Sequence, residues 1–209
     1  MFITLEGPEG SGKTSHVKPL AEWLATRGQG RRVYVTREPG GTDIGEQIRA
    51  VIHDLKNVEM HPRAETLLYQ AARAQIVEQV IRPKLAAGYI VLCDRYTDST
   101  LAYQGYGHQQ NLDEVRALIR YATGGLVPDL TLLLDVEVEV GLKRKIRVNE
   151  WNRLDAYTLE FHQRVRAGYL EMVKQEPGRW IVVDASQAWE AVQEGVRQEV
   201  IRALEGRGL

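Results

Sequence analysis

Near its N-terminus the chain reads Gly7-Pro8-Glu9-Gly10-Ser11-Gly12-Lys13-Thr14, which fits the pattern G-x-x-x-x-G-K-[ST] at every fixed position. The short β-prone run at residues 2–5 precedes it, and apolar residues at helical spacing follow it. Glycines let successive N–H groups turn toward a polyanion, and the start of a helix adds partial positive charge. The pattern therefore predicts a phosphate-binding loop, with Lys13 on the β- and γ-phosphates and the Thr14 hydroxyl on Mg²⁺. A glycine-rich turn that merely caps a helix is the disfavoured alternative.

The chain has 209 residues and a formal net charge of −1. This length suits one α/β domain over residues 1–209, and the charge disfavours a protein that mainly binds nucleic acid. No run of 18 apolar residues occurs and no basic leader precedes the first strand, so we expect no membrane span and no signal peptide. Cys93 is expected to be a buried thiol, and the cytoplasm is the expected compartment.

Five apolar runs are expected to form strands, at residues 2–5, 33–36, 89–93, 130–135 and 180–183. Stretches of helical period lie between them. This alternation predicts an α/β fold with right-handed crossovers and a five-stranded parallel sheet flanked by helices. Ligands of such sheets bind beyond the carboxyl ends of the strands, so the residues just after each strand are the candidates for a site.

The second strand ends at Arg37, and the sharp turn Pro39-Gly40-Gly41 follows. Arg37 could bind a phosphate or form a surface ion pair, and spacing alone does not separate the two. Arg49, on the next helix, is a weaker candidate of the same kind.

A long helix is expected over residues 64–81, and Tyr69 and Arg73 share one of its faces because they lie four residues apart. An aromatic ring beside a guanidinium can stack on a nucleobase and bond its edge. Periodicity alone favours the alternative, which is a Tyr–Arg contact on a solvated face.

Two aspartates, Asp94 and Asp135, end buried strands and compete to hold Mg²⁺ through water. Arg95 follows the first of them, where the charge of a transferred phosphate would need neutralising. Residues 98–107 add many hydrogen-bonding groups.

The densest basic cluster of the chain follows the fourth strand and comprises Lys143, Arg144, Lys145, Arg147 and Arg153. A mobile flap over ATP competes here with an ordinary solvated helix face. Glu160 and Arg164 have the spacing of a helix ion pair. Residues 184–187 follow the last strand and could pack against adenine, and Ser186 is expected to cap the helix that begins near Trp189.

Several segments together resemble the thymidylate kinase family, at residues 5–14, 36–42, 67–73, 94–105 and 152–155. The stretch at 94–105, DRYTDSTLAYQG, is much more specific than the phosphate loop. The resemblance implies a P-loop NTPase fold of the nucleoside monophosphate kinase type. It also implies an enzyme that makes dTDP from dTMP and Mg·ATP and forms a homodimer. It implies a nucleotide-binding region near residues 37–105 and a lid segment at residues 141–156. A kinase for UMP, CMP or AMP is the nearest rival, and a P-loop switch is a more distant one.

The resemblance also implies individual roles. The ATP-binding residues would be Gly7, Pro8, Glu9, Gly10, Ser11, Gly12, Lys13, Thr14 and Arg144. The dTMP-binding residues would be Arg37, Pro39, Arg49, Tyr69, Arg73, Arg95, Ser99, Thr100, Tyr103 and Gln104. Glu9 would lie near the sugar 3′-hydroxyl and Tyr103 near the 2′ position. The Glu38–Pro39 bond is expected to be cis.

The resemblance also implies which side chains act in catalysis and metal binding. Lys13, Arg95, Arg153 and Glu9 would act on the reacting phosphates, and Thr14, Asp94 and Glu160 would hold or adjoin Mg²⁺. Because the loop carries Pro8 and Glu9, the chain resembles the bacterial type, in which the lid supplies an arginine. That arginine would be Arg153, with Arg144 and Arg147 as further candidates. Asn152 and Asp155 depart from the acidic residues that usually flank it, and the lid segment is unusually rich in lysine.

Overall fold

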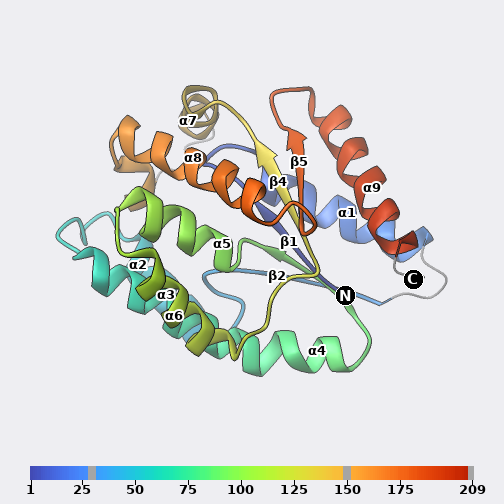
Figure 1. The fold of residues 1–209 in the computed structure, drawn as a ribbon, viewed down its shortest axis with the longest axis horizontal. Helices are drawn as coiled ribbons and strands as arrows, with labels where there is room; N and C mark the ends of the chain where they lie inside the picture. The colour runs from blue at the N-terminus through green and yellow to red at the C-terminus, as the bar shows by residue number, and fades with distance from the viewer. Residues whose placement is uncertain (28–31, 148–151, 207–209) are drawn as a thin grey trace.

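The computed structural model describes residues 1–27, 32–147 and 152–206, so positions 148–151 of the predicted lid segment lie outside the described residues (Figure 1). The strands are β1 (Phe2–Glu6), β2 (Val33–Arg37), β3 (Ile90–Asp94), β4 (Leu130–Asp135) and β5 (Trp180–Asp184). The α-helices are α1 (Lys13–Arg27), α2 (Asp43–His53), α3 (Pro62–Ile76), α4 (Arg82–Ala86), α5 (Thr97–Thr100), α6 (Leu112–Thr123), α7 (Val138–Arg147), α8 (Leu159–Gln175) and α9 (Trp189–Glu205). Shorter helical turns are η1 (Val77–Ile81), η2 (Leu101–Gly107) and η3 (Arg153–Ala156).

The five strands form one parallel sheet in the order β2-β3-β1-β4-β5. This confirms the predicted strands and their parallel arrangement. The chain places β2 and β3 on one side of β1, and β4 and β5 on the other, so the strand order reverses beside β1. The crevice at such a reversal is where open α/β sheets bind ligands, and the loop after β1 opens there.

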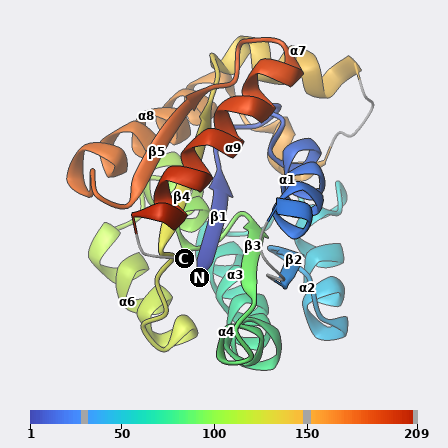
Figure 2. The same cartoon turned by 90° about the vertical axis from the view of Figure 1, so that its right-hand side faces the viewer.

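Helices cover both faces of the sheet (Figures 1 and 2). On one face α1 and α9 bury residues spaced three to four apart, such as Leu20 and Leu24 or Val196 and Val200, against the strands. On the opposite face α8 and η2 pack over β4, while α3 and η1 pack over β3. Because both faces are covered, the strands lack polar alternation, as predicted.

Two sequence-based expectations differ from the structure. The long helix begins at Pro62 after an N-cap at His61, and beyond Ile76 it widens into the π-helical turn η1 before α4. The predicted cap by Ser186 is wrong, because Ala188 is the N-cap of α9 and makes no side-chain bond. The Ser186 N–H is instead held by Asp184 Oδ1 at 2.9 Å.

Cys93 is buried in β3, as predicted, and burial raises the pKa of its thiol. Within the described ranges no helix is long and apolar enough to cross a membrane.

Candidate active site

The phosphate loop, residues 7–14, joins β1 to α1 and requires glycine at several positions. Gly7, Gly10 and Gly12 have φ values of 147°, 68° and 88°, which L side chains rarely adopt. The loop at Gly10 also packs against the backbone of Gly141 in α7. A Cβ on Gly10 would overlap the Gly141 carbonyl, and a Cβ on Gly141 would overlap the Glu9 carbonyl. The loop and the start of the lid segment therefore meet through backbone alone.

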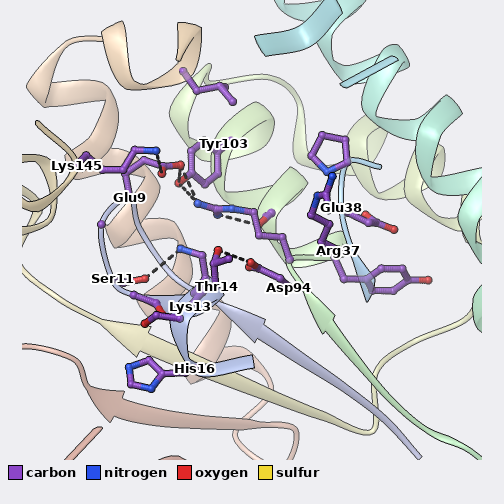
Figure 3. A pocket seen from close by; sticks show the side chains of 18 of the residues that line it. Glu9, Ser11, Lys13, Thr14, His16, Arg37, Glu38, Asp94, Tyr103 and Lys145 are labelled. Carbon is purple, nitrogen blue, oxygen red and sulfur yellow. Dashed lines mark hydrogen bonds and ion pairs between the residues drawn. The ribbon is translucent and has the colours of Figure 1, made fainter. Parts of the chain in front are cut away.

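The Lys13 ammonium lies inside the loop (Figure 3). It donates to the carbonyls of Gly7 and Pro8 at 2.9 Å each and to Ser11 Oγ at 3.0 Å. Burial, with a further contribution from Arg95, lowers the pKa of Lys13 to about 7. This amine is thus buried and surrounded by oxygen acceptors at the centre of the loop.

Thr14 distinguishes between the two competing aspartates. Its hydroxyl donates to Asp94 Oδ2 at 2.5 Å (Figure 3). Asp135 instead forms a two-bond ion pair with Arg166 of α8, at 2.8 and 2.9 Å. Asp94 is therefore the strand-end carboxylate that adjoins the loop hydroxyl.

Arg95 has a φ of 66°, which is unusual for a residue other than glycine and turns its side chain back over the loop. One guanidinium nitrogen donates to the Gly7 carbonyl and to Ser99 Oγ, each at 3.1 Å. The other donates to Glu9 Oε1 at 2.7 Å and to the Tyr103 hydroxyl at 3.2 Å. The guanidinium is thereby fixed at the mouth of the phosphate loop.

Glu9 lies among cations at this mouth. Burial alone would raise its pKa, but nearby positive charges, Arg95 first, outweigh burial and lower the pKa to about 2. The Tyr103 hydroxyl also donates to Glu9 Oε1 at 2.8 Å. Glu9 is thus ionised at neutral pH and orders both Arg95 and Tyr103.

Arg37 and Arg49 extend from β2 and α2 toward the same cavity. Arg37 makes two bonds to Glu46, at 2.8 and 2.9 Å, so the surface ion pair exists and the side chain lines the cavity as well. Arg49 donates to the Pro39 carbonyl at 3.0 Å. The Glu38–Pro39 bond is cis, as expected.

Arg73 is buried rather than solvated, so the solvated-face alternative is wrong. It donates to Glu38 Oε2 at 2.7 Å, to Thr100 Oγ1 at 2.8 Å and to the Tyr96 carbonyl at 2.9 Å. Burial raises the pKa of Tyr69, which therefore stays a neutral phenol. Both side chains line the cavity. Periodicity could not indicate this, because the partner that draws Arg73 inward, Glu38, comes from a different element.

Gln104 lines the cavity and donates its amide nitrogen to Glu65 Oε1 at 2.7 Å. Glu65 is fully buried and is also bonded by the His108 ring at 3.2 Å, by the Tyr157 hydroxyl at 3.0 Å and by Arg153. These partners lower the pKa of Glu65 to about 2 although burial opposes them. Sequence reasoning missed Glu65, since a lone glutamate early in a helix carries no distinguishing pattern.

The expectation that Arg153 reaches the phosphates differs from the structure. Its guanidinium is buried, pairs with Glu65, and also bonds the Ile52 carbonyl at 2.7 Å and the Tyr157 hydroxyl at 2.6 Å. It does not line the cavity. Every side of this guanidinium is occupied by partners that the 152–155 segment alone could not reveal.

Glu160, which was expected to adjoin Mg²⁺, likewise lies outside the cavity that Thr14 and Asp94 line. It is exposed in the first turn of α8, where Thr158 is the N-cap. A hydrogen bond from its own backbone N–H and, second, one from the Thr158 side chain lower the pKa of Glu160. These contacts place Glu160 in the N-terminal turn of α8, where an acidic side chain is favourable.

The cavity measures about 1080 Å³, above the roughly 300–1,000 Å³ of a site for one small ligand. The predicted residues that line it are Glu9, Gly10, Ser11, Gly12, Lys13, Thr14, Arg37, Pro39, Arg49, Tyr69, Arg73, Asp94, Arg95, Ser99, Thr100, Tyr103, Gln104 and Arg144. The structure thus brings together nearly all of the predicted site in one cavity.

Some lining residues were not among the predicted site residues, such as His16, His53 and Trp189, and Lys145 was noted from the sequence only as part of the basic cluster. His16 and Trp189 stack with ring centroids 5.1 Å apart and planes 10° apart, at the end of the cavity next to β5. Trp189 also donates to Ser15 Oγ at 3.0 Å. The sequence pointed to this end of the cavity only indirectly, because Trp189 follows closely after residues 184–187, which were expected to pack against adenine.

A parallel sheet with this strand order and a phosphate loop after β1, with further arginines across one shared cavity, defines a P-loop nucleoside monophosphate kinase fold. Comparison with known proteins narrows the class. A family model described as Thymidylate kinase matches residues 5–196.

Curated relatives and a solved structure agree with that match. Thymidylate kinase of Roseiflexus castenholzii is 52% identical over 94% of this chain and 90% of its own. That of Exiguobacterium sp. is 47% identical over 100% and 98%. The crystal structure of thymidylate kinase from Ehrlichia chaffeensis superposes with a TM-score of 0.78 at 33% identity, covering 98% of both chains. The chain belongs to the thymidylate kinase family, and it is a kinase that phosphorylates dTMP.

Proposed function

We propose that the described cavity binds ATP and dTMP side by side and that the residues around Lys13 and Arg95 carry the phosphoryl transfer. The observation that carries this proposal is the position of Arg95, whose guanidinium bonds both the Gly7 carbonyl of the phosphate loop and Glu9 on the opposite side of the loop mouth. A phosphoryl group passing between two nucleotides must cross this mouth. An oxygen of the dTMP phosphate attacks the γ-phosphorus of ATP, and ADP leaves with the electrons of the broken P–O bond.

On the ATP side, Lys13 exchanges its bonds to the loop carbonyls for bonds to the β- and γ-phosphates, and residues 7–14 supply backbone donors. Arg144, which donates to the Ala185 carbonyl at 2.9 Å, lies toward the adenine end. On the dTMP side, Arg37, Arg49 and Arg95 hold the phosphate. In this scheme the whole chain acts as one domain, with residues 37–105 on the monophosphate and the lid segment over ATP.

At the base end, Tyr69 stacks on thymine while Arg73, Gln104, Thr100 and Ser99 surround the base edge. Tyr103 crowds the 2′ position and favours deoxyribose. Arg73 needs no rearrangement to do this, because Glu38 and Thr100 already fix it in the cavity wall.

The donor set next to the loop fits Mg²⁺. The Thr14 hydroxyl and the Asp94 carboxylate are hard oxygen ligands only 2.5 Å apart, and Mg²⁺ in such sites takes one or two protein oxygens and completes its shell from phosphates and water. When bound with ATP, the ion neutralises charge on the phosphates. Asp94 and Thr14 would orient its waters.

A substrate panel tests the activity. ADP release from Mg·ATP is measured with dTMP, dUMP, UMP, CMP, AMP and GMP offered singly. We expect strong turnover with dTMP and weaker turnover with dUMP. Preferential turnover of UMP, CMP or AMP would keep the phosphate chemistry and overturn the roles of Tyr69, Tyr103 and Gln104.

Replacing Tyr69 by alanine will raise the KM for dTMP by about 5- to 150-fold, because base–aromatic stacking is worth about 1–3 kcal/mol. The kcat should change much less, since the ring lies at the base end rather than at the loop. Steady-state kinetics with varied dTMP measure both, and Tyr69→Phe, which keeps the ring, is the control. An unchanged KM in Tyr69→Ala would remove the stacking role.

Trp189 and His16 offer an aromatic surface where the adenine of ATP would lie. Titration with ATP or ADP will therefore quench the fluorescence of Trp189, and the quench will be absent in Trp189→Phe. Since other tryptophans remain in that variant, it serves as an internal reference. A quench of the same size in Trp189→Phe would place the adenine elsewhere.

We further propose that the chain acts as a homodimer in the cytoplasm. The half-exposed apolar side chains of Ile44, Val51 and Leu67 lie on the adjoining helices α2 and α3, which supports a docking face for a second copy. The buried free thiol of Cys93 suits a reducing compartment. Sedimentation velocity distinguishes one chain from two.

A further inference from the structure

The phosphate loop carries Pro8 and Glu9 and no basic residue before Lys13, so a further cation on the ATP side has to come from another element. The lid segment adjoins the loop at Gly10 and Gly141 and is rich in basic residues. In the described part of that segment, 141–147 and 152–156, the basic side chains that line the cavity are Arg144 and Lys145. Arg144 is held toward β5 by the carbonyls of Ala185 and Ser186, at 2.9 and 3.4 Å. Lys145 lies closer to the chemistry.

Lys145 points toward the loop mouth (Figure 3). Its Nζ lies 4.0 Å from Glu9 Oε2 and 3.3 Å from Asp155 Oδ2, and its side chain is largely buried. The other oxygen of the same glutamate, Oε1, is 2.7 Å from the Arg95 guanidinium. One carboxylate thus lies between Lys145 and Arg95, and the two cations face the same small region of the cavity.

Arg153 cannot reach that region without breaking a buried ion pair. Releasing it would leave Glu65 charged and buried with one strong partner fewer, which is strongly unfavourable. It would also lose the bonds to the Ile52 carbonyl and the Tyr157 hydroxyl. Lys145 also pairs with a buried carboxylate, Asp155, but at 3.3 Å, and Asp155 keeps the bond from the Asn152 N–H at 2.9 Å when the ammonium moves. An ammonium on a flexible four-carbon stem can therefore move from this carboxylate to a nearby phosphate more easily than Arg153 can leave Glu65.

We propose that Lys145 is the lid cation that stabilises the transferring phosphoryl group, in the position for which the sequence pattern suggests Arg153. With the nucleotides absent, Asp155 and Glu9 hold the ammonium beside the loop mouth. As the bond from the dTMP oxygen to the γ-phosphorus forms and the bond to ADP breaks, the ammonium donates a hydrogen bond to an equatorial oxygen and transfers no proton. This inference rests on the proposed function of the cavity.

The alternative is that Lys145 only ties α7 to the η3 turn through Asp155. Four full-length variants separate the two. Lys145→Met removes the charge, Lys145→Arg keeps it, and Asp155→Asn weakens the tie but leaves the cation. Lys143→Met is the matched control, because Lys143 is an exposed lysine on the same helix and does not line the cavity.

We expect Lys145→Met to lower kcat with Mg·ATP and dTMP by about 10²–10³-fold, as for loss of one preorganised charge-stabilising donor, and to leave the KM values nearly unchanged. Lys145→Arg should recover most of the lost kcat, and Asp155→Asn and Lys143→Met should stay within about threefold of wild type. Thermal unfolding and nucleotide binding are measured in parallel. Should Lys145→Met fail to fold, Lys145→Gln is judged by the same criteria.

The inference is overturned if Lys145→Met retains the wild-type kcat, or if Asp155→Asn loses as much kcat as Lys145→Met. It is equally overturned if Lys145→Arg gives no recovery. Failure of the proposed function looks different, because wild type itself would then not turn over dTMP.

Discussion

Arg95→Met will lower kcat for dTMP phosphorylation by about 10³–10⁵-fold, the range associated with an arginine that stabilises phosphoryl transfer. Two phosphates repel each other, and Arg95 is fixed between the loop carbonyl of Gly7 and the carboxylate of Glu9, where the transferred group must pass. The bonds that hold it are already made without ligand, so little reorganisation is needed during the reaction.

Arg95→Lys is the matched control for this variant. It keeps one positive charge on an unbranched side chain at the same backbone position, where φ is 66°, but it loses the planar fork. We expect it to recover only part of the kcat lost in Arg95→Met. Steady-state kinetics with both substrates varied measure the effect, and a kcat unchanged in Arg95→Met would show that the guanidinium is not at the reacting group.

Arg153→Met will lower the free energy of unfolding by about 3–5 kcal/mol, because it leaves the Glu65 carboxylate charged, buried and without its ion-pair partner. If Arg153 were instead the lid arginine, the same variant would lose much of its kcat and keep its full stability. Urea denaturation and kinetics on the same preparations distinguish the two.

The double variant Glu65→Gln/Arg153→Met is the control, since removing both charges should restore much of the lost stability. Arg153→Met as stable as wild type would contradict the buried pair. A double variant less stable than Arg153→Met would show that the bonds to Gln104, His108 and Tyr157 need the charge on Glu65.

The Glu65–Arg153 pair also predicts how the free energy of unfolding depends on pH in acid. Glu65 has its pKa lowered from 4.5 to about 2 in the folded protein, so its ionised form stabilises the fold above pH 4.5. That contribution decreases as the pH falls from 4.5 toward 2, where the carboxylate becomes protonated in the folded state as well. Between these values, the unfolding free energy of wild type should fall more steeply than that of the double variant. Equal slopes would contradict the lowered pKa.

The sequence was sufficient for the sheet and for the phosphate loop, because both depend on local signals. Buried strands have continuous apolar runs, and residues 7–14 require glycine for reasons contained in the loop itself. The strand that supplies the metal-side aspartate was not predictable in this way. Asp94 and Asp135 have equivalent local settings, and they differ only because α8, far along the chain, places Arg166 against Asp135.

The positions of Arg153 and Arg73 could not be read from local sequence, for one shared physical reason. Each guanidinium is positioned by a buried carboxylate more than thirty residues away, Glu65 for Arg153 and Glu38 for Arg73. Periodicity reports which face of a helix a residue occupies and says nothing about a partner on another element. The pairing drew one arginine into the cavity wall and the other away from the cavity.

The backbone contact between Gly10 and Gly141 limits where the lid segment can bend. A contact that admits no side chain on either partner leaves little room for sliding, so we expect the first turn of α7 to move together with the phosphate loop. If the proposed lid closes over ATP, we expect its hinge to lie C-terminal to Gly141. Spin labels at Lys143 and beyond would report the swing of the segment, whereas a label placed before Gly141 would keep a constant distance to the central sheet.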